Sequence, residues 1–510
     1  MRNENGEYAL TRQAESHHQI PSEILDLYHL DMVSYLGEDE PAGLLRKWIE
    51  LAAERWGVSE PLWADFLDGV LLIPLLLALH QKDNLLKGET IQLSLVAYGL
   101  REALSDLFVS KGWARREPDV LLLTEVGQFL VDRALIMGTS ASYKPMLAAL
   151  PELLFGDPKR VFSRDTFGHE RHLDRTLNVV ASGFQHEKFF ADVDEIITDI
   201  FNRPLEEQPH YVADMGCGDG TFLSRIYEVI RTRSARGRML HEHPLQVIGI
   251  DYNQRALDAT TKTLAQIPHL VLRGDIGDPE QLVLDLQARG INPNEVLHIR
   301  SFLDHERPFL PPHASREKRA AQRIHLAYEG VYVDERGQAI PPHIMIQGLV
   351  EHLERWARLG TKHGLILLEV HCLPPKVVAE FRDESENLHF DAYHAFSGQY
   401  LVEADVFLIS AAEAGLLPKA EFFRRYPSVL PFSRITLNCF EKKPYQIRLA
   451  HHDDLLALLD LEDQCQPETE RASAAMLQER IEQYPTGHCI LSVDGDIVRV
   501  IYTQRHNIHK

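Results

Sequence analysis

The stretch from Tyr211 to Ile230 places an acid and three glycines where a chain could bind a small polar ligand. An apolar segment ends at Asp214, and Gly216, Gly218 and Gly220 follow at every second position. Glycines at such a turn allow positive φ angles and a close approach of the backbone to a ligand. The apolar spacing after the turn predicts a helix, whose first N–H groups face the same ligand. Two ligand classes fit: a dinucleotide, or a ligand that ends in an amino acid and a sulfonium.

Two further acids follow apolar segments of the same region. Asp251 ends a predicted strand at 245–251, and Asp275 ends the next one at 270–275. Because the carboxyl ends of parallel strands meet at one edge of a sheet, we expect both acids to lie beside Asp214. Asp251 would accept hydrogen bonds from ribose hydroxyls. Asp275 would lie near an adenine amino group, with Ile276 packed on the ring.

The order Asp-x-Gly-x-Gly-x-Gly resembles the cofactor motif of S-adenosylmethionine (SAM) methyltransferases more than the G-x-G-x-x-G turn of dinucleotide enzymes. For the glycines alone, a structural tight turn is the alternative, and the two downstream acids favour SAM. The resemblance implies SAM binding by Asp214, Gly216, Gly218, Asp251, Asp275, Ile276 and Arg300.

Histidines follow the fourth and fifth predicted strands, at 295–301 and 364–371, and could move a proton. The segment RSFLDHERPF (300–309) is similar to a motif of small-molecule O-methyltransferases whose histidine is the general base. Leu303 stands at that position here, so we expect His305 to be the base, with His371 as a second catalytic residue. For either histidine, an ordinary hydrogen-bonded residue is the alternative.

The same region could hold a divalent metal. Histidine, carboxylate and amide ligands with open positions suit Fe(II) or Mn(II). We expect His305, Gln347, His371 and Asp304 to be the ligands, with Asp278 or His394 as substitutes for Gln347. No spacing among them is a metal signature in itself, and the alternative is a metal-free base at His305.

The elements that must position these residues indicate an α/β fold. Strands and helices alternate from about 211 to 443, which predicts a doubly wound parallel sheet. This part resembles the class I methyltransferase core, Rossmann-like with a seven-stranded sheet. We expect a helical segment at 1–61, a winged-helix-like region of the dimerisation type at 62–140, a helical lid and linker at 141–205, the core at 206–443, and a partial GNAT-like α+β domain at 444–510. The GNAT pyrophosphate loop is absent before Lys510.

The amino-acid composition limits the kinds of ligand and partner that we expect. The 510 residues carry a formal net charge of −22, which argues against nucleic acid as a ligand. The most apolar run, Val70–Leu79, contains Pro74 and is too short to span a bilayer, so no membrane is expected. Five scattered cysteines indicate a reducing, cytoplasmic location.

A winged helix, a methyltransferase core and a trailing half-GNAT domain together resemble the methyltransferase–pseudo-GNAT loading modules of polyketide synthases, of the apratoxin starter-unit type. That resemblance implies a mononuclear iron enzyme that methylates C2 of a malonyl or methylmalonyl group on an acyl carrier protein. It also implies other synthase modules as partners and a homodimer, with the basic stretch 316–323 as the surface for the carrier. A metal-independent small-molecule O-methyltransferase and a non-catalytic docking scaffold are the alternatives.

Overall fold

The computed structural model describes most of the chain: residues 27, 30–37, 42–163, 170–316, 320–321, 328, 330–334, 338–359, 362–382, 385, 388–429, 431–484 and 487–502. The chain divides into two compact units, 1–188 and 189–510. Helix α9 (Arg175–Ile200) crosses from one unit into the next.

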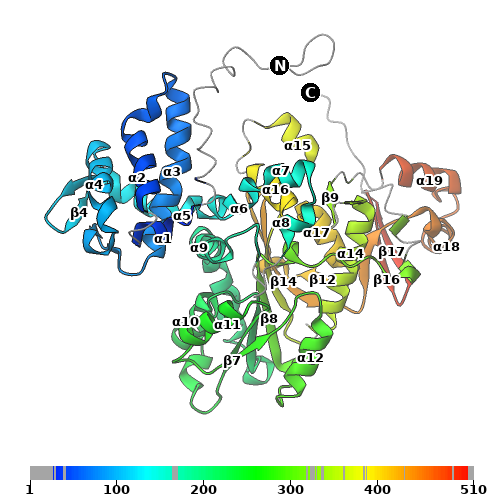
Figure 1. The fold of residues 1–510 in the computed structure, drawn as a ribbon. Coiled ribbons are helices and arrows are strands. Elements are labelled where there is room, and N and C mark those ends of the chain that lie inside the picture. The colour runs from blue at the N-terminus through cyan, green and yellow to red at the C-terminus, as the bar shows by residue number, and fades with distance from the viewer. Residues whose placement is uncertain are drawn as a thin grey trace, which may run out of the picture. The chain divides into compact units, whose positions relative to one another are not determined.

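The first unit contains a winged-helix arrangement. Its four short strands form an antiparallel sheet in the order β1-β2-β4-β3. Gly112 adopts a φ of +71° between α4 and β3, and Thr124 caps α5 by accepting a hydrogen bond from the Gly127 N–H group (3.2 Å). The elements are α1 (Met32–Gly37), α2 (Ala42–Ala53), α3 (Pro61–Gln81), β1 (Leu86–Lys87), β2 (Thr90–Gln92), α4 (Arg101–Ser110), β3 (Ala114–Arg116), β4 (Val120–Leu123), α5 (Glu125–Ser142), α6 (Lys144–Ala148), α7 (Leu150–Phe155) and α8 (Pro158–Phe162). Figure 1 labels most of them.

Helix α3 is the one described helix that is long and apolar enough to cross a membrane by length and composition. Its leucines at 67, 71, 75 and 79 have no exposed surface and belong to the core of the first unit. Core helices pass the same length and composition test, so the packing of α3 accounts for its apolar sequence.

The second unit is built on one large sheet. Along it the strands run β12-β14-β11-β8-β5-β6-β7, and the five from β11 to β7 are parallel. The seven strands of this order are β5 (Tyr211–Met215), β6 (Gln246–Asp251), β7 (His269–Arg273), β8 (Val296–Ser301), β11 (Leu365–Val370), β12 (Leu416–Pro418) and β14 (Ile435–Lys442). The prediction of parallel strands alternating with helices holds for the first five strands.

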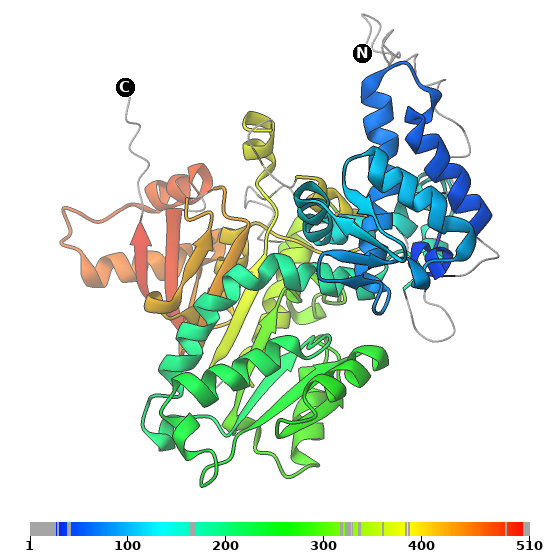
Figure 2. The ribbon, with the colours of Figure 1, turned by 90° about the vertical axis from the view of Figure 1, so that its left-hand side faces the viewer.

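Helices cover both faces of this sheet, as Figures 1 and 2 show. Alternate strand residues belong to different cores: Val212 packs with α9 and α10, whereas Ala213 packs with α12 and with Trp356 of α14. The covering helices are α10 (Thr221–Arg233), α11 (Gln254–Thr263), α12 (Pro279–Gln287), α14 (Pro342–Ala357), α15 (Pro375–Glu380), α16 (Leu388–Phe396) and α17 (Ala404–Glu413). A small hairpin, β9 (Tyr332–Val333) and β10 (Ala339–Ile340), precedes α14.

The expectation of seven strands, all parallel, is corrected on two points. The sheet is mixed, because β14 runs antiparallel to β11. It also has eight strands among the described residues, because two short strands share the outer edge of β14. β12 pairs with Phe440–Lys442, and β13 (Arg424–Tyr426) pairs with Ile435–Leu437. The predicted single strand at 420–426 is therefore a 3₁₀ turn followed by β13.

The end of the second unit contains the predicted strand, two helices and hairpin. Strands β15 (Gln446–Leu449), β16 (His488–Val493) and β17 (Asp496–Tyr502) form an antiparallel sheet. Helices α18 (Leu455–Cys465) and α19 (Ala474–Gln483) pack with it through Leu458, Leu477 and Ile490. The hairpin turns at Asp494 and Gly495, both at positive φ.

Candidate functional site

The glycine turn after β5 has the backbone that its sequence predicts. Gly216, Gly218 and Gly220 have φ angles of +79°, +56° and +80°. A Cβ atom at Gly216 would lie 2.9 Å from Leu303, and one at Gly220 would lie 3.0 Å from Thr260. Both positions therefore need glycine for conformation and for space. The turn brings the backbone directly against the segment that follows β8.

Asp214 and Asp251 end neighbouring strands beside this turn. Asp251 accepts hydrogen bonds from the N–H groups of Gly218 (3.2 Å) and Asn253 (2.9 Å). Asp214 is 1% exposed, and its Oδ1 atom has no hydrogen-bond partner among the described residues. Burial, and secondarily the charge of Asp251, raise the pKa of Asp214 well above its usual range. A ligand that carries an ammonium or sulfonium is the kind that would keep the Asp214 carboxylate ionised.

The third predicted acid lies at the next strand end, on the surface. Asp275 is exposed and accepts a hydrogen bond from the Gly277 N–H group (2.7 Å). Ile276 is buried, and its carbonyl oxygen accepts a hydrogen bond from the Trp356 indole (2.9 Å). The structure thus brings Asp214, Asp251 and Asp275 to the carboxyl ends of β5, β6 and β7, in the order that the sequence predicts.

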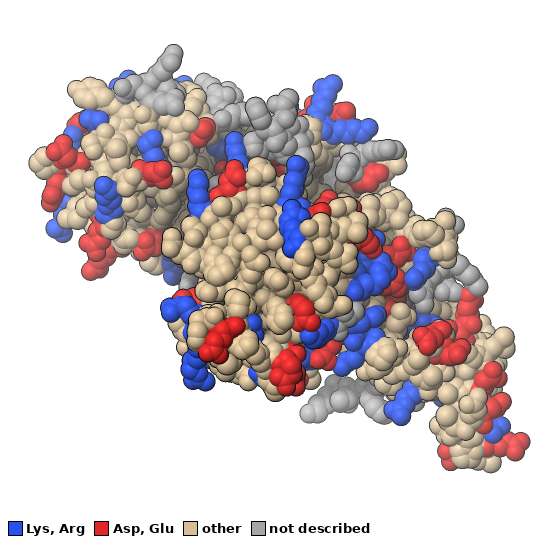
Figure 3. All heavy atoms as spheres, turned by 90° about the horizontal axis from the view of Figure 1, so that it is seen from below, with Lys and Arg blue, Asp and Glu red and all other residues tan. Residues whose placement is uncertain are grey.

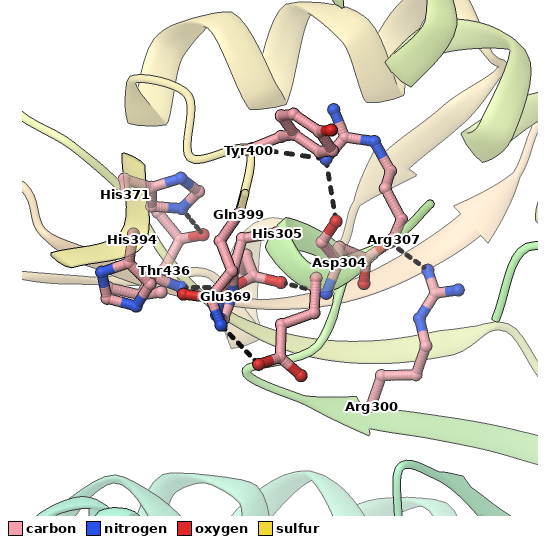
Figure 4. Close-up of polar contacts among 12 residues, drawn as sticks. Arg300, Asp304, His305, Arg307, Glu369, His371, His394, Gln399, Tyr400 and Thr436 are labelled. Atoms are coloured by element: carbon pink, nitrogen blue, oxygen red, sulfur yellow. Dashed lines mark hydrogen bonds and ion pairs between the residues drawn. The ribbon is translucent and has the colours of Figure 1, made fainter. Parts of the chain in front are cut away.

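A second cluster of polar side chains lies after β8 and β11 (Figure 4). Phe302 adopts a positive φ of 54° and turns the chain, so that the short helix Asp304–Glu306 follows at once. His305 is buried and its Nδ1 atom lies 2.7 Å from Glu369 Oε1. Glu369 also accepts hydrogen bonds from the backbone N–H groups of Asp304 (2.6 Å) and Val370 (2.8 Å).

The Glu369 carboxylate sets the protonation of His305. Burial alone lowers the pKa of His305, but the charge of Glu369 and its hydrogen bond outweigh burial, so the pKa lies above its usual value. The Nδ1–H group then donates to Glu369, which fixes the tautomer and directs the basic Nε2 atom away from the carboxylate. This arrangement suits a general base.

Asp304, Arg300 and His352 form a buried charged group behind this pair. Arg300 and Asp304 make an ion pair at 3.1 Å, and His352 Nε2 lies 3.0 Å from the same Asp304 oxygen. Burial raises the pKa of Asp304, but Arg300 and His352 more than offset this and hold it below its usual range. The Arg300 guanidinium also lies over the Trp356 ring, 4.3 Å from its centroid.

This packing changes the roles expected for two residues. The Arg300 side chain has no exposed surface and is engaged by Asp304 and Trp356, so it supports the site from inside instead of lining a surface open to SAM. Asp304 is held by Arg300 and His352 and does not pair with His305. Tertiary burial of strand β8 is the physical reason in both cases.

The predicted metal ligands are not brought together as one set. His371 Nε2 lies 2.8 Å from Thr436, and burial lowers the pKa of His371 to about 3. Gln347 donates to Glu351 (2.9 Å). Within the described ranges, no group of three or more His, Cys, Asp or Glu side chains is placed to hold a metal ion.

The ring that lies beside His305 belongs to His394, which the sequence offered only as a substitute ligand. The two ring centroids are 5.1 Å apart and the rings are almost perpendicular. Nearby, Gln399 Nε2 lies 2.5 Å from Glu306 Oε1. Asp278 instead caps helix α12.

Sequence reasoning missed three contributors: Glu369, His352 and Arg307. Glu369 is the one charged residue within the apolar strand β11, which is a usable signal. His352 shares the buried face of α14 with Leu349 and Trp356. Arg307, which follows His305 by two positions, is 4% exposed and donates to backbone carbonyl oxygens. No sequence pattern predicts that contact.

On the face of the molecule that Figure 3 shows, basic and acidic side chains are interspersed and form no patch of a single charge. Of the expected carrier-binding stretch, Arg316 forms an ion pair with Glu354 (3.1 Å), while residues 317–319 and 322–323 lie outside the described residues.

Two family models match the chain. A model described as the AprA MT2-like domain matches residues 170–438, more than half of the chain, and one described as the AprA winged helix domain matches residues 68–157. A search of curated protein sequences found no match. The core has a class I methyltransferase-like fold with a mixed sheet, preceded by a winged-helix domain.

Several solved structures are similar. An O-methyltransferase family protein from Burkholderia thailandensis has 15% identity and a TM-score of 0.40, over 73% of this chain and 94% of that one. Human N-acetylserotonin methyltransferase in complex with SAM has 13% identity and a TM-score of 0.38, over 76% and 99%. The CurJ carbon methyltransferase has 11% identity and a TM-score of 0.35, over 84% and 98%.

Proposed function

The chain belongs to the AprA MT2-like family and is a SAM-dependent methyltransferase, and from that premise we propose that it methylates carbon. The proposed substrate is a malonyl or methylmalonyl group on an acyl carrier protein, methylated at C2 during polyketide starter-unit synthesis. The single observation that carries this proposal is the His305–Glu369 pair beside the cofactor turn. A buried, oriented imidazole is the kind of base that a C–H acid next to two carbonyl groups requires.

Proton transfer is the part of the reaction that this chain's residues perform. His305 Nε2 takes the C2 proton of the malonyl thioester, and the resulting imidazolium is stabilised by Glu369, whose carboxylate it already contacts. Bound SAM would supply an electrophilic methyl group for the C2 carbanion, with its sulfonium as the leaving thioether. The fixed turn at Gly216, in contact distance of Leu303, supports a short path between the two centres.

SAM is expected to be held by the turn and by three strand ends. The buried Oδ1 of Asp214, to which no described residue donates, supports a cationic end group there, and Asp251 supports the ribose contact. Asp275 and Ile276 are proposed for the adenine. Arg300 is not included, because its side chain is already engaged by Asp304 and Trp356.

A divalent metal is a separate part of the proposal. Asp304, Gln347 and His371 each contact another side chain, and among the described residues they do not gather with His305 into one ligand set. The ring beside His305 is that of His394, and a metal held by both would take the Nε2 atom of His305, so His305 would act either as the base or as a metal ligand. Fe(II) or Mn(II) bound there would supply Lewis-acid stabilisation of enolate charge. No step above depends on it, and the assay below is run with chelator-stripped protein and again with each metal.

The experiment uses the purified chain, SAM with a ¹³C-labelled methyl group, and carrier protein loaded with [2-¹³C]malonyl. C-methylation gives a one-bond carbon–carbon coupling in the product, whereas O-methylation gives a methoxy signal without it. A methoxy product would replace the proposal with the O-methyltransferase alternative. Failure to bind SAM in calorimetry would favour a non-catalytic scaffold.

The carrier protein, other synthase modules, a homodimer and a cytoplasmic location belong to the same proposal. A pseudo-GNAT character of residues 444–510 belongs to it as well. It is supported by the strand, two helices and hairpin, and predicts that this part does not bind acyl-CoA.

A further inference from the structure

The geometry points to Arg307 as the residue that recognises a free carboxylate next to the reacting carbon of the substrate. This inference rests on the proposed function, because it names the group by which that function's substrate is selected. It assigns specificity to a residue that follows the base by two positions in the same turn.

Arg307 is a buried cation without an acidic partner. It is 4% exposed, and among the described residues no Asp or Glu side chain forms an ion pair with it. The two nearest acids are engaged elsewhere: Asp304 by Arg300 and His352, and Glu369 by His305 and two backbone N–H groups. A buried charge of this kind is costly unless it meets an anion or a full set of acceptors.

The hydrogen bonds of Arg307 are distributed unevenly over its guanidinium. One terminal nitrogen, NH1, donates to the carbonyl oxygens of Asp304 (2.8 Å) and Tyr400 (3.4 Å). The other, NH2, reaches only the Met345 thioether (3.3 Å), and no described residue accepts from Nε. Nε and NH2 form the edge that a carboxylate takes in a bidentate pair. A methionine side chain is a weak acceptor and flexible enough to yield to a carboxylate oxygen.

A second buried arginine, Arg236, has a hydrogen-bond acceptor for every nitrogen of its guanidinium and serves as the comparison. Arg236 is 1% exposed and also has no acidic partner among the described residues. All three of its nitrogens donate to oxygen: Nε to His243 (2.9 Å), NH1 to Gln208 (3.0 Å) and NH2 to Pro244 (3.2 Å). Arg236 is therefore complete as a structural residue. Arg307 has its position fixed on one side and a carboxylate-binding edge on the other.

The position of Arg307 matches the chemistry of a malonyl group. The backbone N–H of Tyr400 donates to the His305 carbonyl (2.7 Å), and the Tyr400 carbonyl in turn accepts from Arg307, so base and guanidinium are tied to one segment. Figure 4 shows Arg307 beside Tyr400. In a malonyl thioester the free carboxylate is bonded to the carbon that loses its proton. A guanidinium held by the segment that also holds the base would bind that carboxylate while the base reaches C2.

The test compares malonyl-pantetheine with malonamyl-pantetheine, in which an amide of equal size replaces the carboxylate. Wild type is expected to prefer the malonyl compound by about 10- to 100-fold in kcat/KM, mostly through KM, the range of a charge-assisted hydrogen-bonded pair. Arg307→Gln is expected to lose the preference, and Arg307→Lys to keep part of it. The control Arg236→Gln is expected to keep the preference in full, whatever it does to stability.

Calorimetry with SAM shows that each variant is folded. An unchanged preference in Arg307→Gln, or an equal loss for both compounds with SAM binding intact, would overturn the assignment in favour of a purely structural clamp. If wild type binds SAM but methylates neither compound, the proposed function fails, and binding of the two compounds to protein loaded with S-adenosylhomocysteine then decides the role of Arg307. Equal binding of both by wild type would also overturn it.

Discussion

The cofactor turn and the cluster beyond β8 face the same edge of one sheet but are constructed in different ways. The turn consists of backbone: alternate glycines at positive φ, with Asp251 accepting from a main-chain N–H group. The cluster consists of buried side chains from β8, β11, α14 and the segment at 399–400. Only the cluster beyond β8 contains buried side chains of opposite charge that pair with one another.

This difference predicts what a substitution does in each of the two regions, which are called here the cofactor half (the glycine turn and its acids) and the catalytic half (the cluster beyond β8). Loss of one acid in the cofactor half removes hydrogen bonds to a ligand and to main-chain N–H groups, but it leaves no buried cation unpaired. Loss of one charge in the catalytic half leaves another buried charge without its partner, which is costly to the whole fold. The four predictions below separate effects on ligand, catalysis and stability on this basis, from the largest to the smallest.

The base gives the largest expected effect. His305→Ala should lower kcat by about 10²- to 10⁴-fold, the usual contribution of general base catalysis. SAM affinity should stay unchanged, because the cofactor half is separate. The matched variant is His371→Gln, which changes a histidine bound to Thr436 and should reduce kcat far less. Equal losses in the two variants would show that the sequence was right to treat both as catalytic.

Arg300→Met tests the buried charges. It leaves Asp304 without its cation and should lower the free energy of unfolding by about 3–5 kcal/mol, measured by urea denaturation. Arg231→Met breaks an exposed, solvent-screened pair with Glu228 and should leave the free energy of unfolding almost unchanged. If the Arg300 variant folds fully but loses SAM affinity, the cofactor role first expected for Arg300 would be restored.

Asp251→Ala tests the cofactor half alone. Each lost charge-assisted hydrogen bond to SAM should weaken binding by about 1.5–3 kcal/mol, and the loss of the acceptor for the Gly218 and Asn253 N–H groups should lower the unfolding midpoint as well. The control is Asp258→Ala on the exposed side of α11. Calorimetric titration with SAM measures both. An unaltered dissociation constant in the Asp251 variant would remove this acid from the cofactor site.

The smallest effect is a shift in pH dependence. Glu369 raises the pKa of His305, and only neutral His305 can accept a proton, so kcat should fall as the pH drops through that raised pKa. Glu369→Gln removes the charge and lowers the pKa, so the acid limb should move to lower pH while the plateau falls. A pH–kcat profile for both proteins measures this. A limb that stays in place would mean that another group controls it.

The sequence by itself determined the cofactor half. The alternation of glycines and the acids at 214, 251 and 275 are local features, and the rule that parallel strands end at one edge brings them together. Strands 211–215, 246–251 and 296–301 followed from their apolar runs for the same reason. The two strands that pair with the outer edge of β14 did not follow from the sequence. β12 and β13 are so short that their residues show too little alternation of apolar and polar side chains to predict a strand.

Only the tertiary structure decided the catalytic half. The sequence offered His305 as the base and His371 as a second catalytic residue, and the fold placed one against Glu369 and the other against Thr436. These contacts join residues 64 and 65 positions apart. Their outcome depends on burial, which lowers the pKa of an imidazole unless a carboxylate lies beside it. No local pattern records which carboxylate a buried histidine or arginine will meet, because that partner is chosen by how the strands and helices pack.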